Sequence, residues 1–243
     1  MYRICFSYAS IREKNGIINP VTPYWHLGTL WYTGRMIVVF YFLVLIFSVV
    51  IHEVSHGYAA KMQGDDTAEH MGRLTLNPLR HIDPVGSVIL PLFLYITSRL
   101  AGGPLFLFGW AKPVPYNPLN LKNMRWGQLL VAAAGPFSNL AIATVFGLCV
   151  RFGIAPIDAP LGILFYAIAS INVMLGVFNL TPIPPLDGSK ILFAFLPRQW
   201  DAVEQFLNRN SLILFFAFLF FGVQIIMPVV MWFIQLLTGG VGL

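Results

Sequence analysis

Two histidines and a glutamate form the pattern with the clearest chemical use. Residues 51–57 read Ile-His-Glu-Val-Ser-His-Gly, and no proline interrupts the stretch 36–62, so one helix can run through the motif. Residues four apart share a helix face, so His52 and His56 can offer two imidazole nitrogens to one metal ion. Glu53 can then take a proton from a water held by that metal, as in H-E-x-x-H zinc hydrolases. The motif therefore predicts one bound Zn²⁺ ion, although these ligands also accept cobalt or iron.

The setting of the motif is apolar. No charged residue occurs from Met36 to Ile51, and the turn that carries the motif brings this stretch to the length that a bilayer requires. Ionisable side chains at membrane depth are costly and mark function by default. This placement disfavours the alternative, two histidines that only complete a hydrogen-bonding network.

The composition indicates an all-α polytopic membrane protein, with the lipid bilayer as its surroundings. The 243 residues are 57% hydrophobic and 10% charged, whereas a soluble domain is about 25% charged. The basic residues lie in short segments between apolar stretches, which is typical of topology signals and not of nucleic-acid binding. Cys149 lies in an apolar helix, so no disulfide framework is expected.

Four stretches are apolar and long enough to span the membrane. They are residues 36–62, 128–150, 161–180 and 211–237. Residues 85–110 form two shorter apolar runs joined by Gly and Pro, which predicts a re-entrant or surface hairpin. The alternation Arg73-Leu-Thr-Leu predicts short β segments near the site.

The chain divides by composition near residue 35. Residues 1–35 mix charges, aromatics and prolines, which predicts a membrane-surface or partly disordered segment. Residues 36–243 are expected to form a single domain with its core in 36–200.

Asp187 is the best candidate for a third protein ligand, which a hydrolytic zinc site needs. It follows the third span in a Pro-rich bend. If the first span runs down to the metal and the second returns, the third comes back to the same level, so Asp187 arrives beside the motif. Other candidates lie in the polar connection 63–84, where a solvated loop explains them. They are Asp65, Asp66, Glu69, His70, His81 and Asp83. Asn139 is a buried amide for which two interpretations stay open, a helix–helix hydrogen bond or a contact to substrate or site.

Three segments, 52–57, 135–139 and 179–188, occur in an order that resembles the signature regions of the site-2 protease family, the intramembrane zinc metalloproteases. Segments 72–78 and 109–115 are similar to its compact bacterial members, which lack PDZ and CBS domains. One departure is that Thr and Leu separate Asn179 from Pro182.

The resemblance implies roles for individual residues. His52, His56 and Asp187 would be zinc ligands, and Glu53 the general base and acid. Asn139 and Asn179 would hold substrate backbone or the oxyanion. Residues 112–115 could pair with an unwound substrate strand.

The implied function is regulated cleavage of peptide bonds in or near the transmembrane helix of a single-span membrane protein. The face that carries the site has the longer set of Lys and Arg, which predicts the cytoplasmic face of a bacterial cytoplasmic membrane. The alternative is a membrane zinc-binding or transport protein without proteolytic activity. Transporters usually show internal repeats, and none is visible. No oligomeric state can be inferred from the sequence.

Overall fold

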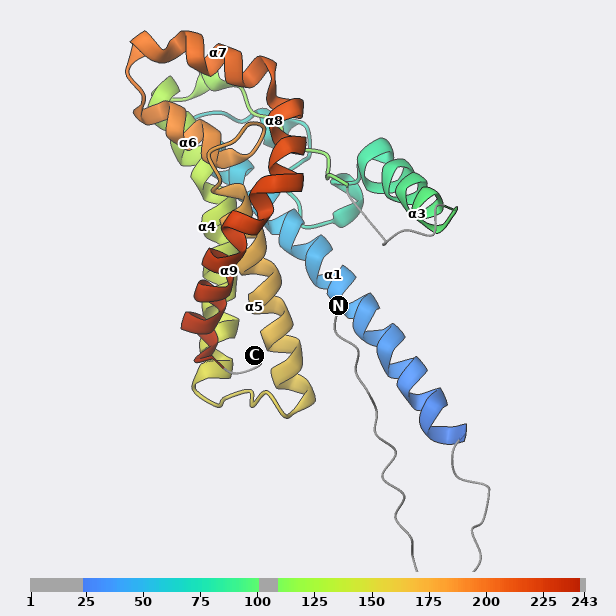
Figure 1. Ribbon diagram of the computed structural model, residues 1–243. Helices are drawn as coiled ribbons and strands as arrows, with labels where there is room; N and C mark the ends of the chain where they lie inside the picture. The colour runs from blue at the N-terminus through green and yellow to red at the C-terminus, as the bar shows by residue number, and fades with distance from the viewer. Residues whose placement is uncertain (1–23, 101–108, 241–243) are drawn as a thin grey trace, which may run out of the picture. The chain divides into compact units, whose positions relative to one another are not determined.

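The computed structural model describes residues 24–100 and 109–240 (Figure 1). The chain divides into two compact units, Met1–Phe40 and Tyr41–Leu243. The described part of the first unit is helical, and the site described below lies in the second. The segment predicted for residues 1–35 lies mostly outside the described residues, and the single domain over 36–243 stays a prediction.

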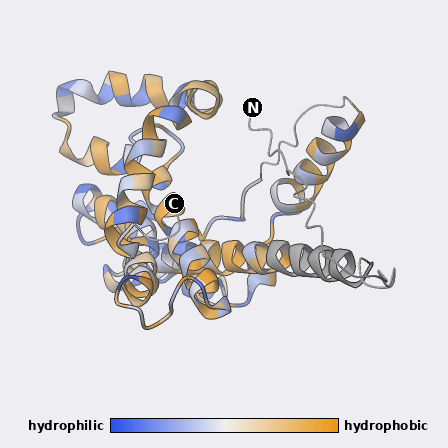
Figure 2. Cartoon of the chain, turned by 60° about the horizontal axis from the view of Figure 1, so that its bottom comes forward, coloured by the Kyte–Doolittle hydropathy of each residue, from blue (hydrophilic) through white to orange (hydrophobic). Residues whose placement is uncertain are grey.

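The four predicted spans are confirmed, and with them the all-α polytopic fold of an integral membrane protein. The apolar stretches long enough to cross a membrane are Val39–Met62 of α1 (Tyr24–Met62), α4 (Met124–Arg151), α5 (Pro160–Asn179) and Ser211–Thr238. The last comprises α8 (Ser211–Ala217), the π-helix η5 (Phe218–Gly222) and α9 (Val223–Thr238). Figure 2 shows that apolar residues dominate these helices.

Shorter helices connect the spans. They are α2 (Thr67–His70), η1 (Pro78–Arg80), η2 (Pro84–Ile89), α3 (Leu90–Leu100), η3 (Pro118–Asn120), α6 (Asp187–Phe195), η4 (Arg198–Trp200) and α7 (Asp201–Arg209). The connection between α1 and α4 and the one between α5 and α8 both bear on the site described below.

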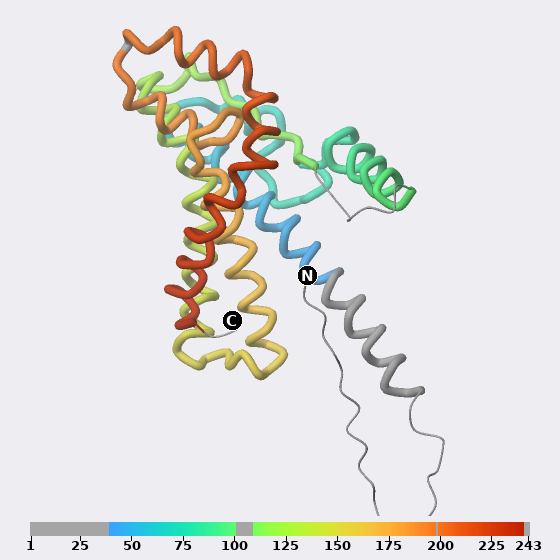
Figure 3. Tube along the Cα trace, viewed as in Figure 1, coloured from blue at the N-terminus to red at the C-terminus, as the bar shows by residue number. Residues whose placement is uncertain are grey.

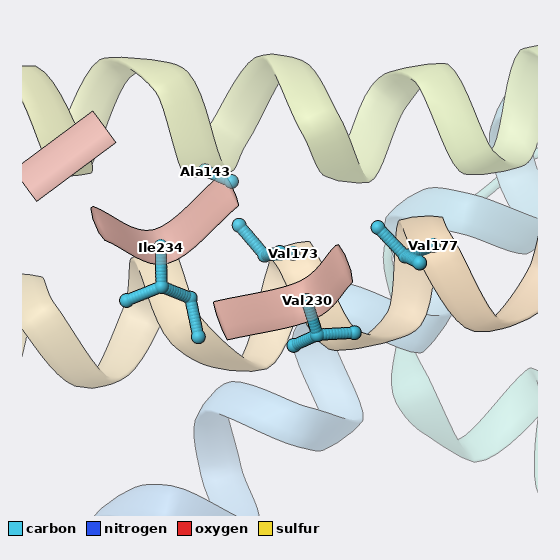
Figure 4. Packing of buried hydrophobic residues seen from close by; sticks show 5 residues of the cluster. All are labelled: Ala143, Val173, Val177, Val230 and Ile234. Atoms are coloured by element: carbon cyan, nitrogen blue, oxygen red, sulfur yellow. The ribbon is translucent and has the colours of Figure 1, made fainter. Parts of the chain in front are cut away.

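Helices α4, α5 and α9 run side by side and form the main apolar core (Figures 1 and 3). Its buried centre comprises Ala143, Val173, Val177, Val230 and Ile234 (Figure 4). Small residues let these helices approach closely, as is usual where lipid supplies no hydrophobic drive between helices. A Cβ at Gly147 of α4, for instance, would lie 2.8 Å from Leu237 Cβ of α9.

The segment that begins at Pro84 is too short to span. Pro84–Leu100 is a shorter apolar helix made of η2 and α3, which agrees with a re-entrant or surface hairpin. Its beginning is bonded to Trp110, because the Trp110 N–H donates to the Gly86 carbonyl over 3.2 Å and Ser87 Oγ donates to the Trp110 carbonyl over 2.8 Å. Most of the predicted second run lies in 101–108, outside the described residues.

The expected short β segments are absent from residues 24–100 and 109–240, so that part of the predicted fold is wrong there. The Arg73 guanidinium, and not a strand, bonds the carbonyls of Lys112 and Pro113. Pro113 and Pro115 have no N–H to donate to a ladder. Sequence alternation could not foresee a side chain taking the place of a strand partner.

Candidate metal centre

Three side chains from two elements converge on one point. His52 and His56 lie on α1, and Asp187 is the first residue of α6. Asp187 Oδ2 lies 3.1 Å from His52 Nε2 and 3.2 Å from His56 Nε2. One ligand atom from each residue lies within 4.8 Å of the others, and all three residues are buried. This is the only such His/Cys/Asp/Glu cluster within the described part of the chain.

The bend after α5 delivers Asp187. Helix α5 ends at Asn179, and the Pro-rich stretch that follows cannot continue it. Gly188 then packs tightly on the end of α5, since a Cβ there would lie 2.2 Å from the Leu180 carbonyl oxygen and 2.5 Å from that of Thr181. Only glycine permits this approach, which brings the start of α6 back against the span.

A buried amide pair sets the tautomer of His52. Asn139 Nδ2 donates to the Ser48 carbonyl over 3.2 Å and to Asn172 Oδ1 over 2.8 Å. A carbonyl can only accept, so Asn139 must turn Oδ1 toward His52 Nδ1, 2.7 Å away. His52 therefore carries a proton on Nδ1, and its neutral ring has a lone pair on Nε2. This is how histidine ligands are commonly oriented.

A backbone carbonyl orients the His56 ring in the same way. Its Nδ1 lies 2.6 Å from the Val131 carbonyl oxygen, which can only accept. The Nε2 lone pairs of both histidines thus face Asp187 Oδ2. Three electron-pair donors this close repel one another unless a cation lies among them. Two imidazole nitrogens and one carboxylate oxygen form a typical donor set of catalytic zinc, so the residues fit this metal.

Gly135 of α4 keeps the space beside both Nε2 atoms free of a side chain. A Cβ at this position would lie 2.5 Å from His56 Nε2 and 2.6 Å from His52 Nε2. Helix α4 thus packs directly against the two candidate ligand histidines at this position.

A lysine lies beside the Asp187 carboxylate. Lys190 Nζ lies 3.7 Å from Asp187 Oδ1 and 5.9 Å from the centre of the Tyr116 ring. Lys190 was not singled out from the sequence, although its place one helical turn after Asp187 is a signal that could have found it.

Glu53 lies beside this cluster on α1. The Val114 N–H donates to Glu53 Oε2 over 2.9 Å. Val114 belongs to the extended segment between α3 and α4, so the predicted base is held by backbone from another part of the chain.

The two candidate substrate-binding asparagines lie in different places. Asn139 is fully buried, and its amide contacts His52, Ser48 and Asn172. Both a helix–helix hydrogen bond and a contact to the site are realised, and the geometry gives no support to a substrate contact. Asn179 donates to the Leu175 carbonyl of its own helix. Its substrate-binding role stays a prediction.

The solvated-loop interpretation is wrong for two of the rival ligands, His81 and Asp65. His81 is buried, and its Nε2 lies 2.8 Å from the Thr75 carbonyl oxygen. Asp65 is fully buried and accepts hydrogen bonds from Thr67, Asn117 and Asn120. Burial alone would raise the pKa of this carboxyl, but these bonds outweigh it and lower the pKa. Asp65 thereby ties the end of α1 to the segment before α4.

Comparisons with known proteins agree with this geometry. Residues 156–222 match Peptidase family M50. YwhC of Bacillus subtilis (strain 168), named as a candidate zinc metalloprotease, is 40% identical over 162 residues, which are 64% of this chain and 68% of that protein. Rip2 of Mycobacterium tuberculosis (strain ATCC 25618 / H37Rv), also named as a candidate zinc metalloprotease, is 31% identical over 178 residues, 70% of this chain and 64% of that protein.

A more distant relative is zinc metalloprotease MJ0392 of Methanocaldococcus jannaschii, which is 26% identical over 164 residues, 67% of this chain and 36% of that protein. No solved structure matches the chain significantly. The identity to YwhC extends over more than two thirds of that relative and so decides the family. The chain belongs to peptidase family M50, the site-2 protease family of membrane-embedded zinc metalloproteases.

Proposed function

We propose that this intramembrane zinc metalloprotease hydrolyses peptide bonds in or near the transmembrane helix of single-span membrane proteins. His52, His56 and Asp187 would hold one zinc ion, and Glu53 would be the general base. The observation that carries the proposal is that the Asp187 carboxylate meets two imidazole lone pairs of α1. This helix is apolar enough to span the membrane.

Each residue around the cluster has a separate role in the proposed reaction. Zinc held by His52, His56 and Asp187 would supply a Lewis acid that polarises the scissile carbonyl and activates water. Glu53 accepts the proton from the attacking water and passes it to the leaving amide nitrogen. Asn139 and the Val131 carbonyl keep both histidines in the tautomer that a metal ligand requires. The Val114 N–H restricts rotation of the Glu53 carboxylate by engaging Oε2.

The depth of the site supports a substrate cut near one membrane face. His56 lies six residues before Met62, the last residue of the span. At a rise of about 1.5 Å per residue, the site is about 9 Å from that end of the helix. A helical substrate hides its carbonyls in hydrogen bonds, so it must unwind locally before cleavage. The excess of basic residues on this side favours the cytoplasmic face of a bacterial cytoplasmic membrane.

The alternative, a zinc-binding or transport protein without proteolytic activity, is not favoured. A zinc carrier does not need a carboxylate beside the metal that is oriented by a separate backbone segment, as Glu53 is. Membership of peptidase family M50 also favours proteolytic activity.

A Glu53→Gln variant tests the proposal. The purified protein is reconstituted in liposomes with a single-span reporter, and cleavage and bound zinc are measured together. We expect one zinc per chain in both proteins and a loss of roughly 10²–10⁴-fold in rate for the variant, the usual contribution of a general base. Glu69→Gln is the matched control, because Glu69 is exposed and paired with Lys61.

Unchanged cleavage by Glu53→Gln with zinc bound would rule out the proposed role of this glutamate. Asp187→Ala tests the ligand set in the same preparation. We expect it to lose zinc, and full zinc occupancy at wild-type affinity would show that Asp187 is no ligand.

A further inference from the structure

Arg73 is a buried cation outside the metal centre. The residue is 7% exposed, and within the described residues no carboxylate lies at ion-pair distance from it. Burying a charge without an acidic partner is costly, so the groups that the guanidinium bonds are informative. Its Nη2 donates to the Lys112 carbonyl over 2.8 Å and to the Pro113 carbonyl over 3.2 Å.

The second of these bonds reaches the general base through one peptide group. The carbonyl of Pro113 and the N–H of Val114 belong to the same peptide unit. Arg73 donates to the oxygen of this peptide unit, and the N–H of the same unit donates to Glu53 Oε2 over 2.9 Å. Hydrogen bonds in series polarise one another, and bonds to charged groups are the stronger ones. The guanidinium and the carboxylate therefore act on opposite ends of one peptide dipole.

The flanking residues seat this peptide on α1. Gly57 lies four residues after Glu53, on the same helix face. A Cβ on Gly57 would lie 2.8 Å from Val114 Cγ1 and 2.4 Å from Leu74 Cδ2, so these two side chains fill the space that glycine leaves. Leu74 follows Arg73 directly, so the loop that carries the arginine and the segment that it bonds dock together beside the base.

We propose that Arg73 is a positioning residue for the general base: it fixes and polarises the Pro113–Val114 peptide, whose N–H orients the Glu53 carboxylate. The inference rests on the function proposed above. Arg73 touches neither the metal ligands nor the reacting atoms, so its effect passes through Glu53. It should therefore appear in kcat and leave metal binding and KM unchanged.

An Arg73→Met variant tests the inference, because methionine keeps much of the apolar stem and removes every donor. In the liposome assay we expect kcat to fall roughly 10–100-fold, less than the full contribution of a general base. KM should stay within about twofold of the wild-type value, and zinc should remain at one per chain. Arg73→Lys should recover most of the rate, since an ammonium can donate to the same carbonyls. Arg80→Met, an exposed arginine of the same connection, is the matched control.

A second pair of variants changes the N–H end of the same peptide. This pair tests the inference even if Arg73→Met does not fold. Val114→Pro removes the N–H that Glu53 accepts, whereas Val114→Ala removes only side-chain packing and keeps this donor. Val114 lies outside helices and strands and already stands between two prolines, a setting that tolerates proline. We expect the proline variant to lose kcat as Arg73→Met does, and the alanine variant to retain most of it.

The Glu53→Gln background separates the inference from a general structural role. If Arg73 acts through Glu53, adding Arg73→Met to Glu53→Gln should lower the residual rate by less than about twofold, because residues that act as a unit are not additive. Wild-type kcat in Arg73→Met, or a loss confined to KM or zinc content, would overturn the inference. Equal loss in both backgrounds would overturn it as well. A wild-type protein that cleaves no reporter, by contrast, would count against the proposed function itself.

Discussion

Gly135→Ala should exclude zinc from the site while leaving the fold in place. The added Cβ would lie 2.5 Å from His56 Nε2 and 2.6 Å from His52 Nε2, far inside van der Waals contact. The rings have little room to retreat, because their Nδ1 atoms are bonded over 2.7 Å and 2.6 Å to Asn139 and to the Val131 carbonyl. Zinc needs both Nε2 atoms at about 2.0–2.1 Å, so the methyl group competes with the metal for the same space.

The effect on folding should be small by comparison. Overpacking a core costs about 1–3 kcal/mol, whereas alanine in a helix interior is favoured over glycine by about 1 kcal/mol. The net loss in the free energy of unfolding is therefore about 0–2 kcal/mol. Zinc affinity should fall at least about 100-fold, the upper end of what removing a hydrogen-bond partner of a metal ligand usually costs.

The assay is a competition titration with a chelator on the purified protein in detergent, together with the thermal unfolding midpoint of the metal-free protein. Gly147→Ala is the matched control. It lies on the same helix, where its Cβ would meet Leu237 Cβ at 2.8 Å, so it shares the overpacking without the histidines. If Gly135→Ala binds zinc within about threefold of the wild-type affinity, the reasoning about the space between the histidines is refuted.

Contacts around the site lead to three further predictions. Asn172→Leu removes a partner of Asn139, and we expect zinc affinity to fall about 10–100-fold in the same titration; an unchanged affinity would mean that the amide pair does not orient the ligand. Lys190→Met should change zinc affinity less than about tenfold, because this ion pair with Asp187 spans 3.7 Å and the lysine side chain is 42% exposed; a loss above 100-fold would refute this ranking. The lowered pKa of Asp65 stabilises the fold above about pH 4 and loses this effect as the pH falls further, so the unfolding midpoints of the wild type and Asp65→Asn should differ most at pH 7 and approach each other as the pH falls below about 4.

Patterns that depend on neighbours along the chain were predicted well from the sequence. The four spans follow from hydropathy alone, because a helix is the structure that satisfies the backbone of a single segment in lipid. The pairing of His52 with His56 follows from helical periodicity, and both lie in the cluster with Asp187. Asp187 could be placed because prolines end α5 where the chain has returned to the level of the motif.

Contacts between distant segments were decided by the tertiary structure. Asn139 faces His52 only because Ser48 and Asn172 fix the orientation of its amide. A side-chain donor took the carbonyls that a β ladder was expected to use, and sequence alternation does not report where a partner carbonyl lies. The sequence by itself therefore determined the membrane spans, the zinc motif and the candidate third ligand, because periodicity, hydropathy and helix breaking are local properties. Only the tertiary structure decided how the ligands and Glu53 are held, because each of those hydrogen bonds joins residues more than 50 positions apart.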